Sequence, residues 1–190
     1  HAVGNQPQVH ALLALMLLNA ARLNARVDAN GNLLRLREQD RSSWNHAMIA
    51  RGMFHLTQSA KGNDLTAYHL QAAIAACHCS APDWQSTDWP RILSLYDQLV
   101  KLDDSPVVAL NRAVAVAEVR GPAEGIKSVA AIPDQKSLGA YYLFYAVLAE
   151  FEIQLKDFPA AAEHLRRALQ LTEIKSERAL LEARLRDCGK

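Results

Sequence analysis

The feature that most constrains the fold is a helical spacing of apolar residues, which recurs along the whole chain between short polar or proline-containing breakers. A period near 3.6 residues predicts amphipathic helices, and connections this short favour antiparallel neighbours. Half of the residues are hydrophobic and 22% are charged, which is typical of a folded globular chain. We expect helices near residues 7–24, 40–62, 66–79, 89–102, 106–120, 122–131, 138–155, 158–172 and 175–187.

One segment, ARVDANGNLLRL at residues 25–36, breaks the helical spacing. Asn30-Gly31 is a dipeptide that favours a tight turn, and the leucines and valine around it could supply short flanking strands. The expected fold class is therefore all-α with one short β-hairpin near residues 25–37. We expect a single domain over residues 1–190, with the first helix, hairpin and long helix in 1–62 and stacked helix pairs in 63–190.

Charge and hydropathy exclude several classes of protein. The 21 basic and 20 acidic residues give a net charge of +1, so this chain has no bulk electrostatic reason to bind nucleic acid or an anionic membrane. The most apolar run, residues 11–21, is shorter than the roughly 18 residues that a membrane span needs, and it lacks the features of a signal peptide. The start at His1 instead of Met indicates a fragment of something longer.

The cysteines carry little sign of chemistry. Cys77, Cys79 and Cys188 are an odd number without framework spacing, which favours reduced thiols in the cytoplasm. Cys77-His78-Cys79 does not predict a zinc site, because adjacent helical residues point in different directions and no second ligand pair follows. No P-loop, nucleophile elbow or dinucleotide glycine pattern occurs. We therefore expect no metal, no cofactor and no enzymatic activity.

The stretch SPVVALNRAVAVAEVRGP, residues 105–122, places polar side chains in an otherwise apolar helix. Asn111 and Glu118 are seven residues apart and lie nearly over one another, with Arg112 about 100° away. Gln71 and His78 repeat this spacing in an earlier helix. Two interpretations stay open. These side chains either bind a partner or satisfy a loop carbonyl and a carboxylate inside the stack.

Two junctions supply further candidates. Asp40-Arg41, between the hairpin and the next helix, is expected to be a cap with its own ion pair, although such junctions also dock partners. Trp89 follows Asp88 and is expected either to anchor the start of a helix or to bind a partner. Arg166-Arg167 is expected on a solvated helix face.

The segment YAVLAEFEIQLKDFPAAAEHLRRALQLTE, residues 145–173, resembles a tetratricopeptide (TPR) repeat. Its large and small residues fall where that repeat packs two helices, although Glu152 replaces the usual aromatic residue and Glu173 the usual proline. Two weaker copies precede it. In TPR stacks the first helix of each pair lines a concave groove, so the resemblance places Gln71, His78, Asn111 and Glu118 along such a groove.

Five blocks in order also resemble one larger family. QVHALLALMLLNAAR, ARVDANGNLLRLREQDRSSWNHAMIARG, YHLQAAIAACH, TDWPRILSLYDQL and SPVVALNRAVAVAEVRGP are similar to the C-terminal extension of extracytoplasmic-function (ECF) RNA polymerase sigma factors that carry TPR-like repeats. The sigma DNA-binding domains have no counterpart in this chain, so DNA binding is not expected of it.

The family implies a cytoplasmic bacterial transcription factor whose extension contacts its own sigma domains, RNA polymerase or a small regulatory protein, such as those of DGPF/YCII type. A free-standing TPR scaffold that binds peptides is the alternative, and a helical hydrolase has no supporting residues. Because the first helix is apolar on most sides, we also expect it to pack against sequence missing here or against a second copy.

Overall fold

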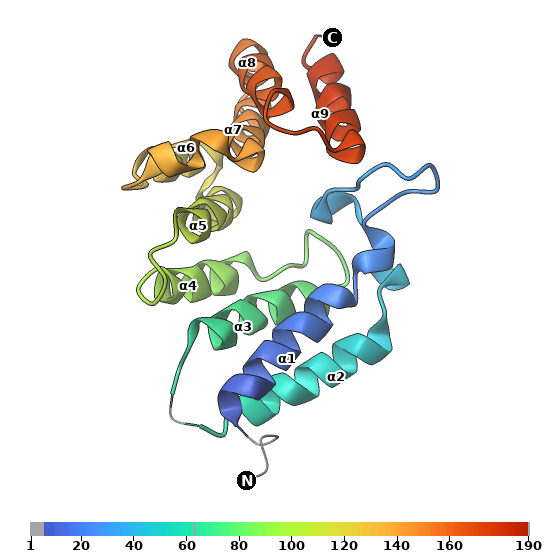
Figure 1. Ribbon diagram of the computed structural model, residues 1–190, viewed down its shortest axis with the longest axis vertical. Coiled ribbons are helices and arrows are strands. Elements are labelled where there is room, and N and C mark those ends of the chain that lie inside the picture. The colour runs from blue at the N-terminus through green and yellow to red at the C-terminus, as the bar shows by residue number, and fades with distance from the viewer. Residues whose placement is uncertain (1–5, 63, 190) are drawn as a thin grey trace. The chain divides into compact units, whose positions relative to one another are not determined.

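The computed structural model describes residues 6–62 and 64–189, and the regular elements in these ranges are helices (Figure 1). They are α1 Pro7–Ala20, α2 His46–Ser59, α3 Ala67–Ser80, α4 Trp89–Leu99, α5 Pro106–Arg120, α6 Pro122–Ala130, α7 Tyr142–Gln154, α8 Phe158–Leu169 and α9 Lys175–Asp187, with 3₁₀ turns at Leu23–Ala25, Leu36–Glu38, Arg41–Ser43 and Gln135–Ala140. The all-α class is therefore confirmed. No helix in the described ranges is long and apolar enough to cross a membrane.

Helix starts follow from local chemistry. Proline occupies the first or second position of α1, α4, α5, α6 and α8, where its missing N–H removes no helical hydrogen bond. α2 begins later than expected because Asn45 caps it, accepting from the Met48 N–H at 3.0 Å. Asp40 instead caps the preceding 3₁₀ turn.

The expected β-hairpin does not form strands in the described part of the chain. A turn is present around Asn30-Gly31, with Gly31 at φ +80°. Its backbone hydrogen bonds run from the Leu34 N–H to the Arg26 carbonyl (2.8 Å) and from the Asp28 N–H to the Asn32 carbonyl (2.9 Å). A ribbon this short needs apolar cover, and the chain passes directly into the 3₁₀ turn Leu36–Glu38 instead of extending the ladder.

The chain divides into two compact units. Unit 1 comprises residues 1–27 and 34–103, and unit 2 comprises residues 28–33 and 104–190. In unit 1, α1 packs against both α2 and α3, and α4 packs on α3. Gly52 allows the close approach of α2 to α1, since a Cβ there would lie 2.7 Å from the Leu18 Cγ. The boundary that we expected between residues 62 and 63 lies inside unit 1.

Unit 2 is a run of sequential helix contacts, with α5 on α6, α6 on α7, α7 on α8 and α8 on α9. Small residues sit where the helices cross: Ala113 and Ala117 of α5, and Ala149, Ala161 and Ala168 of α7 and α8, are buried. Leucine, valine and phenylalanine side chains fill the space beside them. The short side chains let the backbones approach closely.

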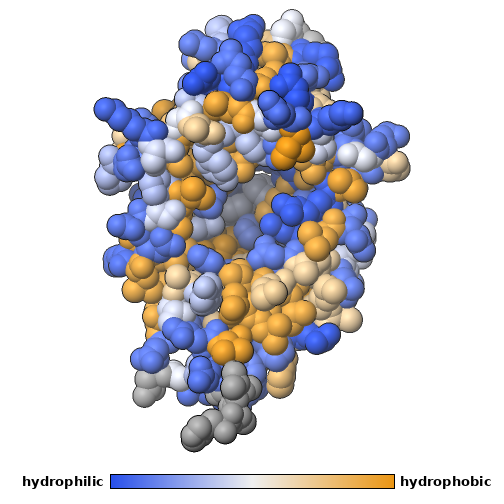
Figure 2. Space-filling model, viewed as in Figure 1, coloured by the Kyte–Doolittle hydropathy of each residue, from blue (hydrophilic) through white to orange (hydrophobic). Residues whose placement is uncertain are grey.

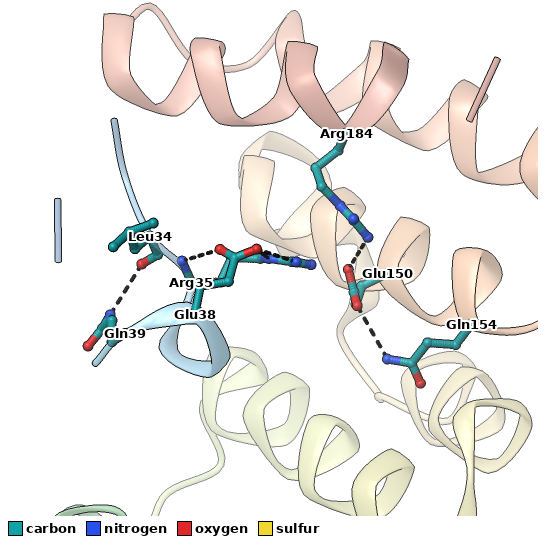
Figure 3. A network of polar contacts seen from close by, with 7 residues as sticks. All are labelled: Leu34, Arg35, Glu38, Gln39, Glu150, Gln154 and Arg184. Carbon is teal, nitrogen blue, oxygen red and sulfur yellow. Dashed lines mark hydrogen bonds and ion pairs between the residues drawn. The ribbon is translucent and has the colours of Figure 1, made fainter. Parts of the chain in front are cut away.

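Polar contacts secure element ends within each unit (Figure 3). In unit 2, Glu150 of α7 accepts from Arg184 of α9 at 2.7 Å and from Gln154 at 3.3 Å. In unit 1, the Glu38 carboxylate accepts from the Arg35 backbone N–H at 2.8 Å and from its Nε at 2.9 Å, which closes a 3₁₀ turn. These hydrogen bonds hold short segments in positions that apolar packing alone does not fix.

Candidate partner-binding surfaces

Arg41 lies in the interior of unit 1, with a relative exposure of 6%. Its guanidinium donates to the His78 carbonyl (2.8 Å), the Ala81 carbonyl (3.1 Å) and the Thr87 hydroxyl (3.0 Å). It also stacks over the Trp44 ring, with 5.3 Å between the guanidinium carbon and the ring centroid. Arg41 therefore joins the end of α3 and the loop after it to the turn before α2.

We expected Asp40 and Arg41 to form an ion pair with each other, and they do not. Asp40 is exposed and accepts from the Ser42 N–H at 2.9 Å and from the Ser42 hydroxyl at 2.7 Å. These bonds lower the pKa of the Asp40 carboxyl below its usual value, with the Ser42 hydroxyl as the largest cause. Asp40 therefore caps the turn. The Arg41 guanidinium points into the unit and donates to backbone carbonyls instead of pairing with Asp40.

An aromatic cluster follows α3 in unit 1. The His78 ring meets the Trp89 ring edge to face at 5.4 Å, and Trp89 packs on Trp84 at 4.6 Å between centroids. Arg37 lies over the Trp84 ring at 5.3 Å. Asp88 caps α4 by accepting from the Arg91 N–H at 2.9 Å, so Trp89 occupies the first turn, as its anchoring interpretation expects.

Titratable groups in this region are held in their uncharged forms. Burial, followed by repulsion from Arg22 and Arg41, lowers the pKa of His78 to about 4. The His78 Nδ1 is enclosed and has no hydrogen-bond partner among the residues that the structure describes. Burial also raises the pKa of Cys79 to about 11 and that of Tyr96 to about 12. The thiolate is the nucleophilic form of cysteine, so a raised pKa leaves the Cys79 thiol protonated and weakly reactive at neutral pH.

The three cysteines carry free thiols. Within the described ranges, no group of three or more His, Cys, Asp or Glu side chains is placed to hold a metal ion. Cys79 uses its thiol locally, donating to the Leu18 carbonyl at 3.6 Å. Burial also raises the pKa of Cys77 above its usual value.

The polar residues of α5 lie in unit 2. Asn111 is exposed, although Leu110 and Ala113 close to it in sequence are buried. Its side chain makes no hydrogen bond with the residues that the structure describes. Arg112 and Glu118 are half-buried. Asn111 thus presents an amide, with two donors and an acceptor, at the surface of a rigid helix.

Gln71 and His78 belong to α3 of unit 1, and both are half-buried. The structure thus brings His78 together with Trp89 and Arg41, whereas Asn111, Arg112 and Glu118 share α5 in unit 2.

Sequence reasoning did not find Arg22, a half-buried cation beside Cys79 and Tyr96. Burial, together with Arg26, lowers the pKa of Arg22 from its usual value. No motif marks this position, because its surroundings come from three different helices or turns.

Apolar side chains remain uncovered on unit 1. Although α1 packs against two helices, Met16 is 60% exposed, and Val9, Leu12 and Leu23 are also exposed. Phe54 of α2 is 58% exposed. Figure 2 shows apolar surface gathered over the region of α1. These exposures leave apolar surface on α1 that the described residues do not cover, and its packing against further sequence or a second copy stays a prediction.

Comparisons with known proteins find a family model and a relative that are similar to this chain. A model described as "Family of unknown function (DUF6596)" matches residues 1–60, which hold α1, the Asp40-Arg41 turn and α2. A protein of Rhizobium meliloti (strain 1021), described as uncharacterized, is 35% identical over 180 residues. The match covers 95% of this chain and 42% of that relative, so the chain spans less than half of the relative's length. No solved structure matches the chain significantly.

Proposed function

We propose that this chain is a regulatory protein-interaction domain of an ECF-type RNA polymerase sigma factor. In this proposal its helix pairs stack as TPR-like repeats, and the protein works in the bacterial cytoplasm without catalytic activity. Its partners are its own sigma domains, RNA polymerase or a small regulatory protein. The observation that carries the proposal is Asn111 of α5, an exposed amide whose side chain makes no hydrogen bond with the residues that the structure describes.

Three further observations support the proposal. The order of the five sequence blocks resembles the extension of such sigma factors. The rhizobial relative has more than half of its length outside the match, which leaves room for further domains in that protein. The sequential packing of antiparallel helices, with alanines at their crossings, is the arrangement that helical repeats use to present one face to a partner.

The chemistry of the surfaces fits a protein partner. An exposed amide on α5 can pair with a partner's backbone, because it both donates and accepts. The apolar side chains of α1 provide surface area that a partner can bury, and polar groups beside them can fix the position of that partner on the surface. In the proposal the α1 face meets either the sigma domains or a second copy of the chain. Sedimentation of the chain alone distinguishes these two occupants.

Transcription in a purified system tests the proposal. The full-length product of the gene is mixed with core RNA polymerase and with promoter DNA selected from its own genome. The proposal expects promoter-specific initiation, and it expects the level of initiation to change when the segment corresponding to residues 1–190 is deleted. A full-length product that neither binds core polymerase nor directs initiation would remove the sigma assignment.

A free-standing TPR scaffold is the alternative function. The same exposed amide and apolar face would then bind a peptide or protein unrelated to transcription. The reading frame of the gene separates the two functions, because a sigma factor requires coding sequence for its DNA-binding helices upstream of His1. A start codon at that point would favour the scaffold.

A further inference from the structure

A pocket lies on the α7–α8 face of unit 2, and none of the functions considered above uses it. Its volume is about 420 Å³, and it is lined by Tyr145, Glu163, His164, Arg166, Arg167 and Gln170. Tyr145 comes from α7, and the other lining residues come from α8 and the position just after it. The sequence interpretation treated Arg166-Arg167 only as a solvated face.

Arg167 is held in place from two sides. Its guanidinium lies over the Tyr145 ring, with 5.8 Å between the guanidinium carbon and the ring centroid. Its Nη1 donates to the Gln170 Oε1 at 2.9 Å. A guanidinium has five N–H donors in a fixed fork, and this hydrogen bond occupies one of the two Nη1 donors. Arg167 is therefore oriented in advance, with donors left for a ligand.

His164, another residue of the pocket lining, pairs with a buried carboxylate of α7. Glu152 is buried in α7, and its Oε2 pairs with the His164 Nδ1 at 2.8 Å. The His164 ring also lies 6.1 Å from the Tyr145 ring. Besides His164, which faces Glu152, the ionisable side chains that line the pocket are two arginines, Arg166 and Arg167, and one carboxylate, Glu163.

Stabilisation of the end of α8 does not account for this arrangement. Cations in the last turn of a helix commonly bind its terminal carbonyls. Here the Arg166 and Arg167 carbonyls accept from the Gln170 backbone N–H at 3.3 Å and 3.2 Å, and the last carbonyl, that of Leu169, accepts from the Arg178 Nη1 at 2.7 Å. The side-chain bond of Arg167 goes to the Gln170 amide, beside an aromatic ring.

We propose that this pocket binds the carboxylate of an aspartate or glutamate in an acidic segment of a partner protein. Planar guanidinium groups match a carboxylate with two parallel hydrogen bonds, and the Tyr145 ring provides a surface for the carbon stem of the side chain. Glu163 at the same pocket opposes the second charge of a phosphate. The net charge of +1 likewise gives no support for nucleic acid.

The proposal is tested on the purified chain with a fluorescein-labelled, glutamate-rich peptide, followed by fluorescence anisotropy. We expect the parent chain to bind this peptide and not the same peptide with glutamine at every glutamate. Arg167→Gln should weaken binding roughly tenfold, as expected for loss of a charge-assisted bidentate pair. Arg167→Lys should recover only part of the affinity, because lysine keeps the charge and loses the fork.

Arg186→Gln is the matched control, since it removes the same charge from an exposed position on α9 outside the pocket lining. It should leave the affinity unchanged. If Arg186→Gln and Arg167→Gln weakened binding equally, the peptide would be bound by general charge attraction, and the proposal would be overturned. Tighter binding of a phosphoserine peptide than of the glutamate peptide would also overturn it. Because the assay uses the chain alone, its result is independent of the sigma-factor proposal.

Discussion

At the residue scale, sequence context misleads about which polar groups are buried. Arg41 stands in a polar run and is buried with three hydrogen bonds, whereas Asn111 stands in an apolar helix and is exposed. Burying a guanidinium is tolerable only if its donors are satisfied, and the carbonyls at the end of α3 provide those partners. Such partners come from residues about 40 positions away along the chain, which local patterns do not reveal.

Replacement of Arg41 by Met should destabilise the protein by about 3 kcal/mol. Methionine fills much of the space, but it leaves the His78 and Ala81 carbonyls and the Thr87 hydroxyl without their donor. Urea unfolding of Arg41→Met is compared with that of Arg26→Met, which changes an exposed arginine. If the two variants unfold at the same urea concentration, Arg41 does not hold unit 1 together.

The pKa of His78 predicts how stability depends on pH. Its folded value, about 4, lies below the ordinary 6.5, so between these values the unfolded chain binds more protons than the folded one. Stability should therefore fall as pH is lowered from 6.5 to 4, with a contribution from His78 of roughly 3 kcal/mol at most. His78→Phe keeps a ring against Trp89 and should flatten this dependence.

The matched control is His46→Phe, at an exposed position at the start of α2. The free energy of unfolding is measured by urea titration at several pH values in this window. An unchanged slope in His78→Phe would mean that His78 is not the group whose protonation opposes folding.

At the element scale, helices were predictable and the hairpin was not. Helical spacing and proline breakers are local signals, and they placed α5, α6 and α9 nearly to the residue. Boundaries shifted where 3₁₀ turns intervene, before α2 and α7, because a 3₁₀ turn carries the same residue types as the first turn of an α-helix. The Asn30-Gly31 turn formed without strands, since strand formation depends on cover that a local pattern does not specify.

Gly125→Ala should lower stability by about 1–3 kcal/mol, although alanine is the better helix former. The added Cβ would lie 2.7 Å from the Ala117 Cβ and 2.9 Å from a ring carbon of Phe151, so α6 would have to move away from its neighbours. Gly139→Ala is the control, because nothing lies within 4 Å of the added Cβ. Thermal unfolding should show a lower midpoint for Gly125→Ala alone, and equal midpoints would contradict close packing at this crossing.

At the scale of the whole molecule, the chain divides into two compact units, each with its own set of packed helices. Composition and periodicity were sufficient to predict an all-helical fold, because most of the packing, apart from that of α1 on α3, joins elements that are consecutive in the chain. The candidate surfaces were less predictable. Asn111 and Trp89 stand out in the sequence, but the Tyr145–Arg167 pocket depends on a stacking geometry and a side-chain bond that arise only when α7 and α8 pack.

The central claim is that α5 presents a surface for a protein partner, and Asn111→Ala in the full-length protein tests it most directly. The Asn111 side chain makes no hydrogen bond within the described part of the chain, so its truncation should leave the thermal midpoint of the protein nearly unchanged. Transcription by core RNA polymerase with this variant should nevertheless change several-fold, whereas Asn24→Ala, at another exposed asparagine, should have no effect. A marked loss of melting temperature, or transcription identical to that of the parent protein, would contradict the claim.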